Sequence, residues 1–170
     1  KVGFQSAPYT NAKEFVDNMK LSTPDSMQYV IKDLFEDITI YENYVKDLKS
    51  VKQADGKYKV TLTVGSVKFK ADTLGKSKAV PVNDWMDIGV FVSNEVNGKK
   101  VDKELVFKKI KMDKPVQSFE FTVDKEPTSA GLDPYNKLID RNPENNRCKF
   151  GTLPKPPDLT EGSGNITISL

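Results

Sequence analysis

Apolar and polar residues alternate in short runs along most of the chain, which is the pattern of β-strands with one buried face. The clearest run places Tyr58, Val60, Leu62 and Val64 on one side. Comparable runs lie at residues 38–51, 67–71, 87–93, 105–110 and 116–123, with turn signals such as Asp55-Gly56 and Asn97-Gly98 between them. These features predict an antiparallel β-sandwich of the immunoglobulin-like type.

The alternation changes phase at Gly65. Before this glycine the apolar side chains occupy even-numbered positions, whereas Val67, Phe69 and Ala71 occupy odd-numbered ones. An extra residue in one strand of a pair produces such a shift, so the sequence predicts a β-bulge or a bend at Gly65.

A helical periodicity precedes the strands. One helix is predicted over residues 12–20, and Thr23-Pro24-Asp25 is a start signal for a second, with a hydroxyl cap, a proline and an acid in the first turn. The second helix carries an apolar stripe at positions i, i+3, i+4, i+7 and i+8, formed by Met27, Val30, Ile31, Leu34 and Phe35. This stripe either docks on the sheet within this chain or faces a partner.

We therefore divide the chain into three parts. Residues 1–40 form a helical segment that ends a preceding helical domain, and residues 41–150 form the sandwich. Residues 151–170 are rich in proline and glycine at first, which predicts a flexible tail. The last six residues, Asn165–Leu170, alternate again and resemble a strand able to pair with an exposed edge.

Composition and charge exclude several classes of protein. Lys+Arg 26 against Asp+Glu 24 gives a net charge of +2, and no motif combines basic with aromatic residues, which argues against nucleic-acid binding. No apolar run approaches the roughly 18 residues of a membrane-spanning helix, so this segment is not expected to insert into a membrane.

The chain contains no histidine. The H-E-x-x-H zinc motif of metallopeptidases and the Ser–His and Cys–His nucleophile pairs are therefore excluded. We predict that the chain is not an enzyme and holds no cofactor or metal. Asp140–Asn146 resembles a calcium loop only faintly, because it lacks the glycine and the bidentate glutamate of such loops. Cys148 is interpreted as an incidental residue near the tail, and Trp85 as a core anchor between the sheets.

The most distinctive stretch follows the last clear strand, at residues 126–146. Its candidate structural or interaction residues are Asp133, Pro134, Tyr135, Asp140, Arg141, Asn142, Pro143 and Asn145. Asp and Asn side chains cap turns and proline makes them rigid, while Tyr135, Leu138 and Ile139 supply an apolar side. We expect the stretch to pack against the sandwich, with Arg141 paired to a nearby acid.

Three passages resemble one family of bacterial membrane proteins, in which an ABC-transporter-type permease is fused to a gluzincin aminopeptidase. Residues 130–146 are similar to the family's closing phrase "AGIDPYNKLIDRNPDDN", and residues 80–91 to "VPLNDWIDIGVF". Residues 23–41 look like its "TPDSLQYLIDDLFETITLYDN" passage, which in the family closes the α-helical domain behind the peptidase.

The resemblance implies a non-catalytic C-terminal accessory domain of a membrane-anchored zinc aminopeptidase, on the periplasmic side of a bacterial inner membrane. Zinc would belong to the parent's catalytic domain, and the partner would be the parent's own peptidase or helical domain. None of the family's catalytic positions has a counterpart in this chain. The alternative is a free-standing β-sandwich that binds a protein or a glycan.

Overall fold

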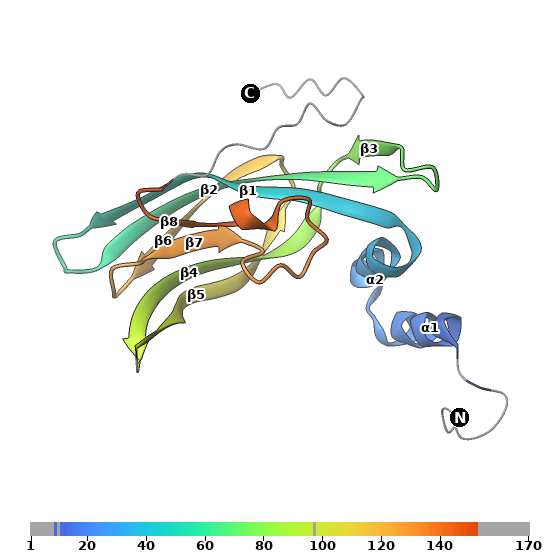
Figure 1. The fold of residues 1–170 in the computed structure, drawn as a ribbon, viewed down its shortest axis with the longest axis horizontal. Helices are drawn as coiled ribbons and strands as arrows, with labels where there is room; N and C mark the ends of the chain where they lie inside the picture. The colour runs from blue at the N-terminus through green and yellow to red at the C-terminus, as the bar shows by residue number, and fades with distance from the viewer. Residues whose placement is uncertain (1–8, 10, 97, 153–170) are drawn as a thin grey trace.

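A computed structural model describes residues 9, 11–96 and 98–152 (Figure 1). In this part of the chain, helical elements precede two four-stranded antiparallel sheets that pack as a sandwich. The predicted fold class, a mainly β antiparallel sandwich preceded by two helices, is confirmed, and the arrangement is compatible with an immunoglobulin-like type. The helical elements are α1 (Ala12–Ser22), η1 (Asp25–Met27), α2 (Gln28–Ile31) and η2 (Lys32–Glu36); a further 3₁₀ turn, η3, covers Pro143–Asn145. The strands are β1 (Ile38–Lys52), β2 (Tyr58–Ala71), β3 (Ser77–Val80), β4 (Asp84–Val96), β5 (Lys99–Met112), β6 (Val116–Val123), β7 (Ser129–Leu132) and β8 (Arg147–Lys149).

The first sheet is built around β2. One side of β2 pairs with β1 along its whole length, from Ala71 opposite Ile38 to Tyr58 opposite Lys52. Its other side is shared, because β6 pairs with residues 58–65 and β3 with residues 68–71. The β1–β2 turn contains the predicted Asp-Gly signal, and Gly56 has the positive φ of +83° that this turn requires.

The second sheet has the order β5-β4-β7-β8. Its last two strands are short and lie on either side of the stretch from Asp133 to Asn146. They approach each other closely at Gly131, where a Cβ would overlap the Asn146 carbonyl oxygen and lie 2.8 Å from Arg147 Cα. Only glycine fits this position without a shift of the neighbouring backbone.

The core lies between the two sheets. It is formed by the inward side chains of both, including Val60, Leu62, Val64, Met86, Ile88, Val90, Met112 and Leu132. Cys148 also belongs to this core, so its interpretation as an incidental residue near the tail is wrong. Burial raises the pKa of its thiol to about 11, so the thiol stays protonated and Cys148 packs as a small apolar core residue.

Two other expectations differ from the structure. The register shift lies in β1, between Val45 and Asp47, and not at Gly65. Gly65 instead accommodates the ring of Tyr44, because any Cβ there would overlap that ring. Trp85 is 45% exposed and is therefore no core anchor.

The helical elements lie at one end of the sandwich, with α1 beyond α2 (Figure 1). Helix changes to strand between Glu36 and Ile38, a few residues before the predicted division at residue 40. The predicted tail lies outside the described residues from position 153 onward. The strand expected at Asn165–Leu170 also lies outside the described residues, so it stays a prediction.

Candidate functional site

The stretch from Asp133 to Asn146, called the closing segment below, connects the two sheets. It begins at Asp133, which has a left-handed φ of 45° and is 2% exposed. The Asp133 carboxylate accepts hydrogen bonds from the backbone N–H groups of Lys137 (3.0 Å) and Leu138 (2.9 Å), while its own N–H donates to the Asp87 carbonyl (2.7 Å). The segment is thereby fixed to β4 at its start.

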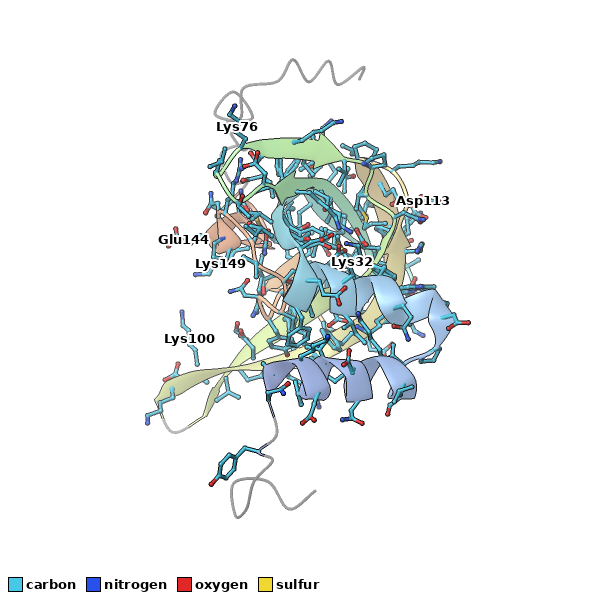
Figure 2. All side chains as sticks on the ribbon, turned by 90° about the vertical axis from the view of Figure 1, so that its right-hand side faces the viewer. Lys32, Lys76, Lys100, Asp113, Glu144 and Lys149 are labelled. Carbon is cyan, nitrogen blue, oxygen red and sulfur yellow. The ribbon has the colours of Figure 1, made fainter. Side chains whose placement is uncertain are left out.

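The middle of the closing segment pairs with the edge of β1. Tyr41 donates its N–H to the Ile139 carbonyl (2.8 Å) and accepts at its own carbonyl from the Arg141 N–H (3.0 Å). The Asp140 carboxylate accepts from the N–H groups of Asn43 and Asn142, both at 2.8 Å. Asp140 therefore caps the β1 edge and stabilises the turn that follows. Figure 2 shows Glu144 of η3 on the same flank of the molecule as Lys149 of β8.

Buried polar side chains line the seam between β1 and the closing segment. Asn145 and Asn146 are almost fully buried, as is Glu42 of β1. Burial, followed by the neighbouring Asp140 carboxylate, raises the pKa of Glu42. Burial also raises the pKa of Asp140, although the N–H groups of Asn43 and Asn142 oppose this shift. Burial is therefore the main cause of both shifts, and the Asp140 charge adds to the shift of Glu42.

Among the described residues, Arg141 pairs with no acid, contrary to the expectation. Its side chain is exposed, its Nη2 donates to Ser77 Oγ (3.2 Å), and its guanidinium stacks 4.3 Å from the centroid of the Phe69 ring. Arg141 therefore joins the closing segment to the β2–β3 end of the first sheet. Its two neighbours Asn142 and Pro143 lead into η3.

The apolar residues of the closing segment have different environments. Leu138 packs on the core, whereas Ile139 is exposed. Tyr135 is half exposed and makes edge-to-face contacts with Phe107 and Phe91, at centroid distances of 5.3 and 5.9 Å. Its hydroxyl donates to Glu104 Oε1 (2.5 Å). Pro134 lies close to Gly89, so the first turn of the segment covers the middle of β4.

The stripe predicted on the second helix is divided between the interior and the surface. Ile31 is buried, Met27 and Val30 are partly buried, and Leu34 and Phe35 are exposed. The Phe35 ring contacts only the edge of Phe15 among the described aromatic rings, at a centroid distance of 6.3 Å. One part of the stripe therefore docks within this chain, and the other part forms an exposed outer face.

A buried group of charges attaches the helical elements to the sandwich. We call Asp33, Asp37, Lys68, Lys70 and Asp84 the ionic cluster. Lys68 Nζ lies 2.5 Å from Asp33 Oδ2 and 2.9 Å from Asp84 Oδ1, and Lys70 Nζ lies 2.7 Å from Asp33 Oδ1 and also pairs with Asp37. Figure 2, in which the helical end faces the viewer, shows Lys32 in front of the sandwich, and Lys32 also pairs with Asp37 (2.7 Å).

Lys68 is the centre of this cluster. It is 6% exposed and lies 5.7 Å from the Tyr29 ring centroid and 5.6 Å from that of Tyr41. Burial tends to lower the pKa of Lys68, but hydrogen bonds to Asp33 and Asp84 outweigh it and raise the pKa. The ammonium thus stays charged while it joins η2, β2 and the start of β4. A buried, fully paired charge of this kind fixes an arrangement of elements more than it adds stability.

None of the sequence predictions includes this cluster. The inward positions of β2 nevertheless continue from Val64 through Ser66 to Lys68 without a change of phase. Continuing the alternation past Gly65 would have placed Lys68 inside. Nothing in the pattern identifies Asp33 as its partner, because the pairing depends on how the helix docks.

Among the described residues, no group of three or more Asp, Glu or Cys side chains is arranged to hold a metal ion. The helices in the same part of the chain are too short or too polar to cross a membrane. The exposed Trp85 lies on the helical side, where its backbone N–H donates to the Tyr29 hydroxyl (2.9 Å) and the Lys111 ammonium lies 5.6 Å from its ring centroid.

Comparisons with protein-family models, with curated proteins and with solved structures find no match to this chain.

Proposed function

We propose that this chain is a non-catalytic accessory domain, C-terminal to the catalytic part of a membrane-anchored zinc aminopeptidase on the periplasmic side of a bacterial inner membrane. The family resemblance of the three quoted passages supports this proposal. The observation that carries it is the outer face of the helical elements. None of the eleven residues of α1 is buried, and Phe15, Leu21, Leu34 and Phe35 are 40–86% exposed.

Such a face is unfavourable in water. A helix of eleven residues is marginal on its own, and most helices are stabilised by burying an apolar face. Clustered exposed apolar side chains are also typical of surfaces that contact another protein. The preceding α-helical domain of the parent is the occupant that the resemblance implies. The ionic cluster would then hold the sandwich in a fixed position relative to that domain, because it fixes η2 to β2 and β4.

Hydrogen exchange tests this proposal directly. The amides of α1 should exchange rapidly in the 170-residue chain and about tenfold more slowly in a longer chain that includes the domain encoded before Lys1. In the longer chain, Phe35→Ser should abolish that protection. Leu74→Ser is the matched control, since Leu74 is 83% exposed in the turn between β2 and β3. A reading frame without an H-E-x-x-H motif before Lys1, or equal α1 exchange in both chains, would contradict the proposal.

The second candidate is a free-standing sandwich that binds a protein or a glycan. The exposed Trp85 with Lys111 beside its ring favours it, because an indole face next to polar groups can stack on a sugar. Trp85 is the one tryptophan of the chain, so its fluorescence reports directly on this surface. A saturable fluorescence change with soluble glycans, lost in Lys111→Ala, would favour this candidate over the first.

A further inference from the structure

A groove runs beside the second half of β1. Its lining residues come from two parts of the chain, Leu48–Lys52 of β1 with Tyr58, and Glu126, Pro127, Phe150 and Gly151. The groove therefore lies where the edge of the first sheet meets the chain that enters β7 and leaves β8. Both parts include apolar residues, such as Leu48, Pro127 and Phe150.

The edge of β1 along this groove is open. The closing segment pairs with the first half of that edge, at Tyr41 and Asn43. Further along, the Leu48 N–H donates to the side chain of its neighbour Asp47 (3.0 Å), so it points away from β2. By strand alternation the main-chain groups of Ser50 and Lys52 point the same way. The described residues supply no main-chain partner there.

An open strand edge beside an apolar wall matches an added β-strand, which brings main-chain donors and acceptors to the edge.

The chain itself supplies a suitable strand. Gly151 lines the groove, and residues 153–170 follow directly after the last described residue. In the final six, Ile166, Ile168 and Leu170 alternate with Asn165, Thr167 and Ser169. The 12 residues between Thr152 and Asn165 can span about 40 Å, whereas a six-residue strand is only about 20 Å long. The tail can therefore reach any part of the groove and turn back along it.

We infer that Asn165–Leu170 binds in this groove as an additional strand on the β1 edge at Leu48–Lys52. Its apolar side chains lie toward Leu48, Pro127 and Phe150, and its polar side chains lie toward solvent. This intramolecular pairing also protects the β1 edge, since an open edge is a template for association with other chains. The inference does not depend on the proposed function.

Amide exchange measured by NMR tests the pairing in the full chain. The Ser50 and Lys52 amides should exchange at least about tenfold more slowly in residues 1–170 than in a chain ending at Thr152. The double variant Ile166→Asp/Ile168→Asp should lose this protection. The matched control is Thr167→Asp/Ser169→Asp, which places the same charges on the solvent side and should keep it. The Val64 amide, in the centre of the sheet, serves as the control for folding.

Two results would overturn the inference. Equal exchange of Ser50 and Lys52 in the full and shortened chains would show that the tail does not occupy the groove. Protection that grows with protein concentration, together with a dimer mass, would assign the groove to the tail of a second copy.

Discussion

Lys68 Nζ lies 2.9 Å from Asp84 Oδ1, and this ion pair connects the two sheets at the end where the helices dock. Both side chains are almost fully buried, and Asp84 contacts no other ammonium among the described residues. Lys68 also holds Asp33, so one cation positions three elements of the fold. An aliphatic side chain at residue 68 would leave the Asp33 and Asp84 carboxylates without this ammonium group.

We predict that Lys68→Met lowers the free energy of unfolding by about 3–5 kcal/mol, because it leaves a buried charge uncompensated. Lys49→Met is the matched control, since Lys49 pairs with Asp47 at the surface and its removal should cost far less. The triple variant Lys68→Met/Asp33→Asn/Asp84→Asn should recover much of the loss. Urea unfolding measures all three, and a Lys68→Met loss no larger than that of Lys49→Met would contradict the prediction.

The ionic cluster also predicts a dependence on pH. Burial tends to raise the pKa of Asp33, but hydrogen bonds from Lys68 and Lys70 outweigh it, so the pKa lies below its ordinary value. A lowered folded-state pKa stabilises the fold above the unfolded value of about 3.9, and that contribution is lost as the pH falls through the folded value. The stability difference between the wild type and Asp33→Asn should therefore shrink on acidification below about pH 4. Unfolding curves from about pH 7 to about pH 3 measure it, and a constant difference would disagree.

The sequence predicted the parts of the fold that depend on local pattern. Strands with a regular alternation, such as residues 58–64 of β2, are present in the structure, as is the turn at Gly56. The short strands β3, β7 and β8 were missed, because three or four residues carry no clear periodicity and form a strand only through pairing with other strands. The contact between Asp140 and Asn43 spans 97 residues, which no local pattern can reveal. The alternation of β2 places Lys68 inside, but its pairing with Asp33 depends on how the helical elements dock, which no local pattern reveals.

The close approach of β7 and β8 gives a test of the second sheet. Gly131→Ala should destabilise the fold by about 3 kcal/mol or more, because the new methyl group would overlap backbone atoms of Asn146 and Arg147, which cannot rotate away. Gly75→Ala is the control. Gly75 also has a positive φ, of +81°, but nothing lies near its missing Cβ, so only the conformational cost of about 1–2 kcal/mol applies. Thermal and urea unfolding compare the two, and equal losses would refute the steric argument.

The absence of histidine leads to a prediction about metal. The isolated chain should bind no stoichiometric zinc and should not cleave aminoacyl-amide reporters, since carboxylates alone form a poor zinc site. Elemental analysis after dialysis against excess zinc measures the first property, and a fluorogenic aminopeptidase assay measures the second. One tightly held zinc ion per chain would contradict the prediction.

Two neighbouring residues of the closing segment, Asp140 and Arg141, make different kinds of contact. Asp140 accepts two backbone hydrogen bonds at 2.8 Å, one of them from the β1 edge, whereas Arg141 is exposed and makes one hydrogen bond and a ring contact. Asp140→Ala would leave the Asn43 and Asn142 N–H groups without their acceptor, so it should lower stability by about 1–3 kcal/mol. Arg141→Ala should cost less than about 1 kcal/mol, the usual contribution of an exposed cation–π contact.

Hydrogen exchange adds a local measurement to this comparison. The Asn43 amide should exchange much faster in Asp140→Ala and nearly as in the wild type in Arg141→Ala, because only the first variant removes its acceptor. If Arg141→Ala proves the more destabilising of the two, then the guanidinium and not the carboxylate holds the segment on β1. If neither variant changes stability, the backbone hydrogen bonds at Tyr41 and the contacts of Asp133 and Leu138 suffice to hold the segment, and the exposed side chains of Arg141 and Asn142 are available to a partner.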